Sequence, residues 1–148
     1  MTKKGFTLIE LLVVISIVGI LIGLSIFGLA GARESSRDAR RKADLELIRS
    51  GLEIYRSDCN TYPVASYSTN WPAQIVGSGS TTSCAVANVY LNSPADPNSP
   101  TRYYRYSSNG ITYELCTSLE QPAPSAGSIT CGGSTVCGQT CNYKVTNP

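Results

Sequence analysis

The chain begins with a long apolar segment and continues as a polar remainder. Between Phe6 and Ala32 the only charged residue is Glu10. A helix needs about 20 apolar residues to cross the hydrocarbon core of a bilayer, and this segment is longer than that. A carboxylate at the bilayer centre costs at least roughly 2.5 kcal/mol and usually marks a function. The pattern therefore predicts a membrane-spanning helix over residues 6–32, with Glu10 as its candidate functional side chain.

The helix is expected to continue beyond Ala32, because the sequence becomes charged without a proline before Pro63. Apolar residues then recur in steps of three and four, the period of an amphipathic helix. They are Ala39, Ala43, Leu47, Ile48, Leu52 and Tyr55. We therefore predict one helix over about residues 6–58, whose amphipathic half, 33–58, packs on a globular domain. The acidic and basic side chains around Arg37 and Arg41 are expected to be balanced by neighbouring subunits.

Residues 59–148 are rich in turn formers and predict a small domain of short strands. The turn formers and proline of Cys59–Pro63 end the helix. Residues 64–101 are expected to be a long connecting loop, with a short element near Asn88–Leu91.

Two strands rich in β-forming residues, 102–107 and 111–119, flank a hairpin turn at 108–110, and a third strand is expected at 141–145. Side chains alternate between the two sides of a strand. We therefore expect Tyr104 and Tyr106 to share one face of the sheet, and Tyr113, Leu115 and Thr117 to share another. Three antiparallel strands packed on the amphipathic helix make an α+β domain.

The segment Gly5-Phe6-Thr7-Leu8-Ile9-Glu10, preceded by Lys3 and Lys4, resembles the class III signal of type IV pilins and type II secretion pseudopilins. The resemblance covers residues 1–58 well and implies the pilin fold. It also implies that residues 1–5 are a leader, that prepilin peptidase cuts between Gly5 and Phe6, and that Phe6 is then N-methylated. Glu10 would be the assembly glutamate.

By this resemblance the chain is a structural subunit of a type IV pilus filament and not an enzyme. It is expected in the cytoplasmic membrane, with its C-terminal domain outside, before it polymerises with other pilin subunits into an extracellular filament. One alternative is a pseudopilin of a type II secretion or competence system. Another is a secreted disulfide-rich binding module cleaved near Ala32, although an ordinary signal has an apolar region of only about 7–15 residues. A plain anchor with Glu10 at the headgroup boundary is the remaining alternative.

Gly19 and Gly23 have the spacing at which small residues let membrane helices approach closely. The family resemblance adds local unwinding of the helix as a second interpretation. Both interpretations remain open.

Six cysteines follow the apolar segment: Cys59, Cys84, Cys116, Cys131, Cys137 and Cys141. An even number on one side of a membrane favours disulfides in an oxidising compartment, and a small domain needs such cross-links. About 15 pairings are possible. We expect Cys59–Cys84 to join the helix end to the next loop and the other four to cross-link the last strands. A zinc site is disfavoured, because the chain has no CxxC pair and no histidine.

The remaining composition argues against other functions. Without histidine there is no Ser-His or Cys-His dyad, and there is no phosphate-binding loop. Nothing in the sequence places the carboxylates Asp96, Glu114 and Glu120 together. The basic cluster 33–42 is interleaved with acids and lacks aromatics, so nucleic acid is not an expected partner. No cofactor or small-molecule substrate is expected.

Calcium is one further cofactor that the resemblance raises. Major pseudopilins bind it in their C-terminal loop through acidic ligands. Residues 121–148 contain no Asp or Glu, and calcium prefers several oxygen ligands including carboxylates. We therefore expect no calcium site there, which favours the type IV pilin over the pseudopilin.

Overall fold

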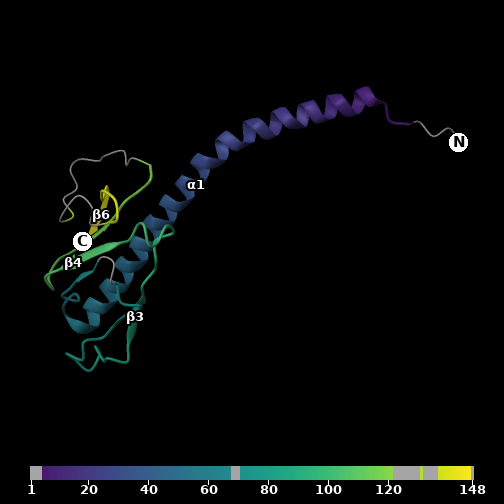
Figure 1. The fold of residues 1–148 in the computed structure, drawn as a ribbon. Coiled ribbons are helices and arrows are strands. Elements are labelled where there is room, and N and C mark those ends of the chain that lie inside the picture. Colours follow the sequence, from purple (N-terminus) through teal and green to yellow (C-terminus); the bar gives the residue numbers. More distant parts are fainter. Residues whose placement is uncertain (1–4, 68–70, 122–130, 132–136, 148) are drawn as a thin grey trace. The chain divides into compact units, whose positions relative to one another are not determined.

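The computed structural model describes residues 5–67, 71–121, 131 and 137–147. One helix, α1, spans Leu8–Cys59, and six strands follow it (Figure 1). The chain separates into two compact units, Met1–Ser36 and Arg37–Pro148. The helical segment predicted over about 6–58 is confirmed.

In the first unit the apolar side chains of α1 that the structure describes are uncovered. From Phe6 to Leu29 the large apolar side chains are 46–81% exposed. Among the described residues, α1 is the one helix long and apolar enough to cross a membrane. Because exposed apolar surface of this extent is unfavourable in water, lipid or another chain must cover it.

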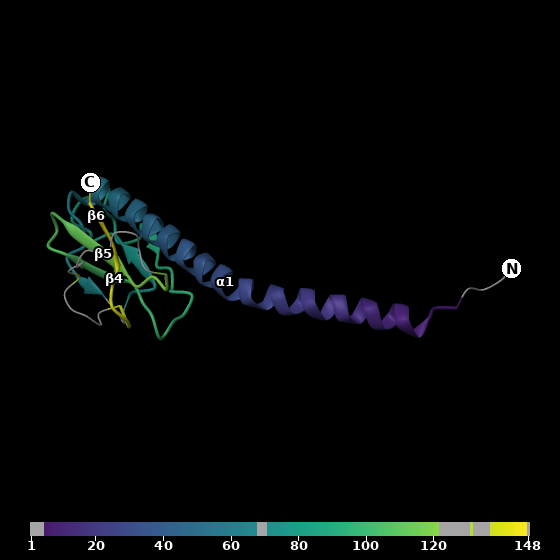
Figure 2. The same ribbon diagram turned by 90° about the horizontal axis from the view of Figure 1, so that it is seen from above.

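The second unit contains two antiparallel sheets. The larger has the order β1-β4-β5-β6, and the smaller pairs β2 with β3. The strands are β1 Ser66–Tyr67, β2 Gln74–Val76, β3 Val89–Asn92, β4 Arg105–Ser108, β5 Tyr113–Thr117 and β6 Tyr143–Thr146. Figure 2 shows β4, β5 and β6 side by side.

The predicted hairpin and third strand are confirmed as β4, β5 and β6, so the domain is α+β. The long loop expected over 64–101 is wrong in part, because it contains β1, β2 and β3. These strands have two to four residues, too few for a period-two pattern to stand out. The element expected near Asn88–Leu91 is the strand β3.

The expectation that Tyr104 and Tyr106 lie on a different face from Tyr113, Leu115 and Thr117 is wrong. Tyr106 lies directly opposite Leu115 in the register of the two strands. Directly opposite residues of an antiparallel pair point to the same side of the sheet. That shared side is buried, and it forms the core with α1.

The buried face of α1 agrees in part with the predicted stripe, of which Ile48, Leu52 and Tyr55 are buried. Its core residues are Leu45, Ile48, Leu52, Tyr55 and Cys59. Ala39, Ala43 and Leu47, which the pattern placed toward the domain, are exposed. Asp38 and Arg41 take part in the buried face instead. A hydrophobic pattern cannot detect this face, because its first turn is buried through charge pairing.

Candidate functional site

The first candidate site lies where α1 begins. Thr7 precedes the first helical residue, and its hydroxyl oxygen accepts the backbone N–H of Glu10 at 3.3 Å. In return Glu10 Oε2 accepts the backbone N–H of Thr7 at 2.9 Å and its hydroxyl at 2.7 Å. This reciprocal pair is a capping box. The Thr-x-x-Glu spacing was visible in the sequence, and the sequence reasoning missed it.

Glu10 also borders an apolar hollow. Phe6, Ile9, Val13 and Val14 surround it, and the hollow measures about 430 Å³. Gly5 and Phe6 are exposed, so the predicted cleavage bond lies on the surface beside this hollow. The three residues predicted for processing and assembly therefore lie within one short exposed segment. Their roles remain predictions.

Gly19 and Gly23 lie inside α1, which is continuous through both positions. A Cβ atom built at either glycine meets nothing within 4 Å. The glycines therefore leave an open surface on this segment, as close packing by another helix requires. Packing in an assembly stays a prediction, as does unwinding.

A second uncovered surface lies on α1 within the globular unit. Leu47 and Ile54 are 54% and 53% exposed. Together with neighbouring residues of α1 and β3 they border an open groove of about 270 Å³. The residues of this groove are Leu47, Ser50, Gly51, Ile54, Tyr90, Leu91 and Asn92. None of them is charged, although charged residues dominate this half of the helix.

Three disulfides pair all six cysteines. They are Cys59–Cys84, Cys116–Cys131 and Cys137–Cys141. The first bond joins the last residue of α1 to the loop before β3, as expected, and the other two lie together in a buried cluster. Within the described residues no group of three or more His, Cys, Asp or Glu side chains is placed to hold a metal ion.

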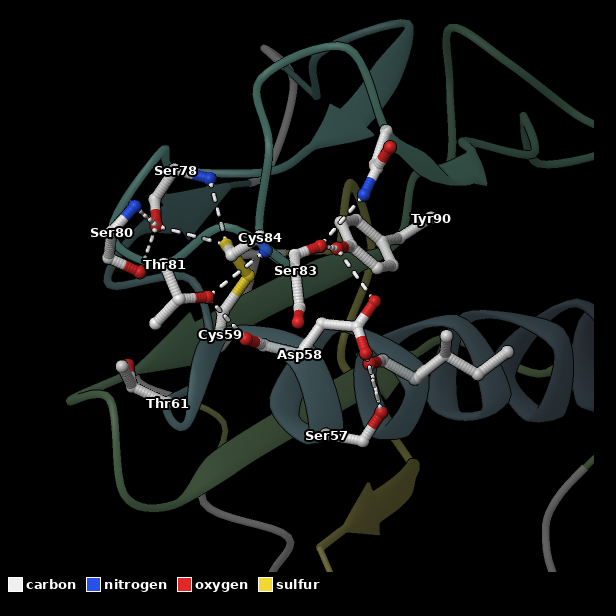
Figure 3. The surroundings of a disulfide bond; sticks show 12 residues. Ser57, Asp58, Cys59, Thr61, Ser78, Ser80, Thr81, Ser83, Cys84 and Tyr90 are labelled. Atoms are coloured by element: carbon white, nitrogen blue, oxygen red, sulfur yellow. Dashed lines mark hydrogen bonds between the residues drawn. A yellow bond between two sulfur atoms is a disulfide. The ribbon is translucent and has the colours of Figure 1, made fainter.

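Figure 3 shows how hydrogen bonds reinforce the first disulfide. The Thr81 hydroxyl donates to the carbonyl oxygen of Asp58 at 2.8 Å, which satisfies a backbone acceptor in the last turn of α1. The Tyr90 hydroxyl donates to the Asp58 carboxylate at 3.0 Å. Ser78 donates its backbone N–H to the sulfur of Cys84. The loop is thus held to the helix end by several contacts besides the covalent bond.

A buried cluster of charges, which we call the charge centre, occupies the other end of the domain. Its members are Arg37, Asp38, Arg41, Asp96 and Glu120. The Arg41 side chain is fully buried and contacts Asp38 at 2.6 Å, Asp96 at 2.8 Å and Glu120 at 2.8 Å. Arg37 forms a second ion pair with Glu120.

The charge centre corrects two expectations. The charges of Arg37 and Arg41 are balanced within the chain, so neighbouring subunits are not needed for this. Asp96 and Glu120, which the sequence did not place together, meet around one guanidinium. Glu114 lies elsewhere and pairs with Lys144 at 3.1 Å. Ion pairs that join residues more than 50 positions apart leave no local sequence signal.

The pKa values of the charge centre follow its contacts. The hydrogen bond from Arg37 and the ion pair with Arg41 lower the pKa of Glu120 from its ordinary 4.5 to about 2. Burial opposes the charge on Arg41, but hydrogen bonds to Asp96, Glu120 and Asp38 outweigh it and raise the pKa of the guanidinium. Both groups therefore stay charged at neutral pH.

Comparison with known proteins supports the family predicted from the first residues. The prokaryotic N-terminal methylation motif matches residues 1–30. The chain is similar to type II secretion system core protein G of Pectobacterium carotovorum subsp. carotovorum, with 38% identity over 61 residues, 41% of this chain and 39% of the relative. The protein of the same name from Aeromonas hydrophila is also 38% identical over 61 residues, 41% of this chain and 43% of the relative.

The core protein G of Escherichia coli strain K12 is 33% identical over 64 residues, 43% of this chain and 44% of the relative. The chain thus spans less than half the length of the curated relatives it matches. No solved structure matches the chain. The matches confirm the resemblance to type IV pilins and pseudopilins. They favour the pseudopilin alternative over the type IV pilus subunit.

Proposed function

We propose that the chain is a pseudopilin, a structural subunit of a filament in a type II secretion system. The precursor is held in the cytoplasmic membrane by α1, with the disulfide-bonded domain on the far side. Prepilin peptidase cuts after Gly5, Phe6 is methylated, and the subunits polymerise through their apolar segments. The observation that carries this proposal is the methylation motif over residues 1–30, together with an apolar helix whose described side chains stay exposed in their own unit.

Polymerisation gives the uncovered surfaces a physical purpose. Leaving lipid exposes the apolar side chains of residues 6–32, and contact between such segments removes them from water again. The uncharged groove around Leu47 and Ile54 offers further apolar surface to a neighbouring subunit. The near-neutral globular domain adds no net repulsion to this association.

Glu10 is proposed to pair with the amine of Phe6 in the same or a neighbouring subunit. In lipid or in a filament core an unpaired charge is costly, so such a pair sets the register of one subunit against the next. In the precursor, the capping box with Thr7 satisfies the Glu10 carboxylate. Cleavage after Gly5 creates the new amine beside it.

Substitution of Glu10 tests the proposal in the host that carries the assembly machinery. Glutamine can take the place of glutamate in a capping box but carries no charge. We expect both Glu10→Gln and Glu10→Ala to lower filament yield severely, with an unchanged melting temperature of the domain. Glu46→Ala, which removes a 55% exposed carboxylate from the same helix, is the control. Wild-type filament yield from Glu10→Gln would contradict the proposed charge pairing.

A type IV pilus subunit is the second candidate. It is favoured by one observation, the lack of Asp and Glu over residues 121–148, where the resemblance leads one to expect calcium ligands. The two candidates differ in filament length and place: a pilus extends from the cell surface, whereas a pseudopilus stays within the envelope. Electron microscopy of cells at native expression distinguishes them, since long surface filaments that disappear on deletion of this chain would favour the pilus.

A further inference from the structure

The charge centre joins three segments that are far apart in the sequence. Arg41 belongs to α1, Asp96 begins the turn that continues through Pro97, and Glu120 follows the end of β5. The Arg41 guanidinium donates two hydrogen bonds to the Asp96 carboxylate, at 2.8 and 3.2 Å. This is the bidentate geometry that arginine and carboxylate groups prefer. The side chains of Arg41 and Asp96 are both fully buried. Three carboxylates therefore converge on one cation that water does not reach.

Backbone N–H groups donate further hydrogen bonds to two of these carboxylates, Asp38 and Asp96. Asp38 accepts the N–H groups of Glu120, at 2.9 and 3.1 Å, and of Gln121, at 2.8 Å. Asp96 accepts the N–H of Asn98 at 2.8 Å. The five side chains of the charge centre carry a net charge of one negative unit. The positive ends of these amide groups face the carboxylates and stabilise that charge. Asp38 thereby holds the start of the C-terminal segment against α1.

We propose that Arg41 is a built-in counter-cation of the domain. Together with Arg37 it offsets two of the three carboxylate charges, and backbone amides face the charge that remains. Folding of the domain therefore draws on no dissolved cation. Arg41 has this role within the folded domain, whether or not the chain polymerises. Two features carry it: the carboxylates are already saturated by guanidinium and amide donors, and residues 121–148 supply no further acid.

The first test compares two neighbouring arginines in the full chain in detergent. Arg41→Ser leaves Asp38, Asp96 and Glu120 without their shared cation, the first two of them buried. Arg40→Ser, in contrast, removes a side chain that is 65% exposed and 3.9 Å from Asp44. We expect Arg41→Ser to lower the melting temperature by roughly 10 °C or more, and Arg40→Ser by about 2 °C or less. Equal small shifts would overturn the proposal.

The second test separates charge compensation from simple packing. In the wild-type chain Asp96→Asn should lower the melting temperature, because it breaks a buried pair. In the Arg41→Ser background the same change should raise it, because it removes one of three repelling carboxylates. If Arg41→Ser does not fold, the double variant should fold better than the single one. A loss from Asp96→Asn in both backgrounds would mean that Arg41 acts only by filling space.

The third test uses the unaltered chain. Because the carboxylates already have their cation, neither calcium chloride nor EDTA at millimolar concentration should shift the melting temperature by more than about 1 °C. Sodium chloride at matched ionic strength is the control for screening. A clear stabilisation by calcium that EDTA reverses would overturn the proposal.

Discussion

Removal of the Cys59–Cys84 disulfide should destabilise the domain more than removal of either other disulfide. The change is the double substitution Cys59→Ala with Cys84→Ala, which leaves no new polar group at two buried positions. This bond closes a loop of 25 residues, whereas Cys137–Cys141 closes a loop of only four. A longer closed loop restricts the unfolded chain more strongly.

The magnitude follows from the loop lengths. In the chain-entropy treatment a 25-residue loop contributes about 3.5 kcal/mol and a four-residue loop about 2 kcal/mol. The expected difference between the two double variants is therefore about 1.5 kcal/mol. The hydrogen bonds from Thr81 and Tyr90 to Asp58 lie next to the first bond, so their loosening would add to its loss.

Urea unfolding of the full chain in a non-denaturing detergent, followed by tryptophan fluorescence, measures the loss. Trp71 is the single tryptophan and packs against Tyr67 and Tyr106, so its emission reports the globular domain. The slope of the transition must match the wild type for the free energies of unfolding to be compared. Equal losses for the two pairs, or a larger loss for Cys137–Cys141, would refute the loop-length reasoning.

Three further predictions concern single positions. Gly77→Ala should lower the free energy of unfolding by about 2 kcal/mol or more, because a Cβ at this position would clash with the backbone carbonyl of Ala85. Urea unfolding measures the change, and an unchanged free energy of unfolding would contradict the close approach. Wild-type stability should fall from pH 4.5 toward pH 2, because the pKa of Glu120 is lowered to about 2 in the folded chain. In Glu120→Gln the loss of stability between pH 4.5 and pH 2 should be smaller than in the wild type, by up to about 3 kcal/mol. Thermal unfolding at several pH values in this range measures the loss, and the same pH profile in both proteins would contradict the role of Glu120. Ile54→Asp should reduce filament yield several-fold without changing the melting temperature, because Ile54 borders the groove. Ile111→Asp, at a 73% exposed site outside the groove, should leave the yield unchanged, and equal yields from the two variants would show that the groove is not part of the assembly surface.

The sequence predicted those elements whose signals are local. The apolar run, the steps of three and four along α1 and the hairpin between β4 and β5 each depend on neighbouring residues. The pairing of Cys59 with Cys84 also agrees with expectation, since both lie close to the end of the helix.

The charge centre and the smaller sheet could not be predicted in the same way. Asp38 and Arg41 look like solvated helix charges until Asp96 and Glu120, brought from distant segments, surround them. Conversely, Leu47 looks like a core residue, but the helix buries Leu45 and Ile48 and leaves Leu47 exposed. Which side of an amphipathic helix faces its own sheet depends on long-range partners, and only the fold supplies those.

Mass spectrometry of the N-terminal peptide, from protein taken from its native envelope, tests the central claim most directly. The proposed function predicts a chain that begins at Phe6 and carries one added methyl group. A chain that begins at Arg33 would contradict it, because Glu10 would then be removed with an ordinary signal. A chain that retains Met1 would contradict it as well, since the segment would be a membrane anchor and not a filament core.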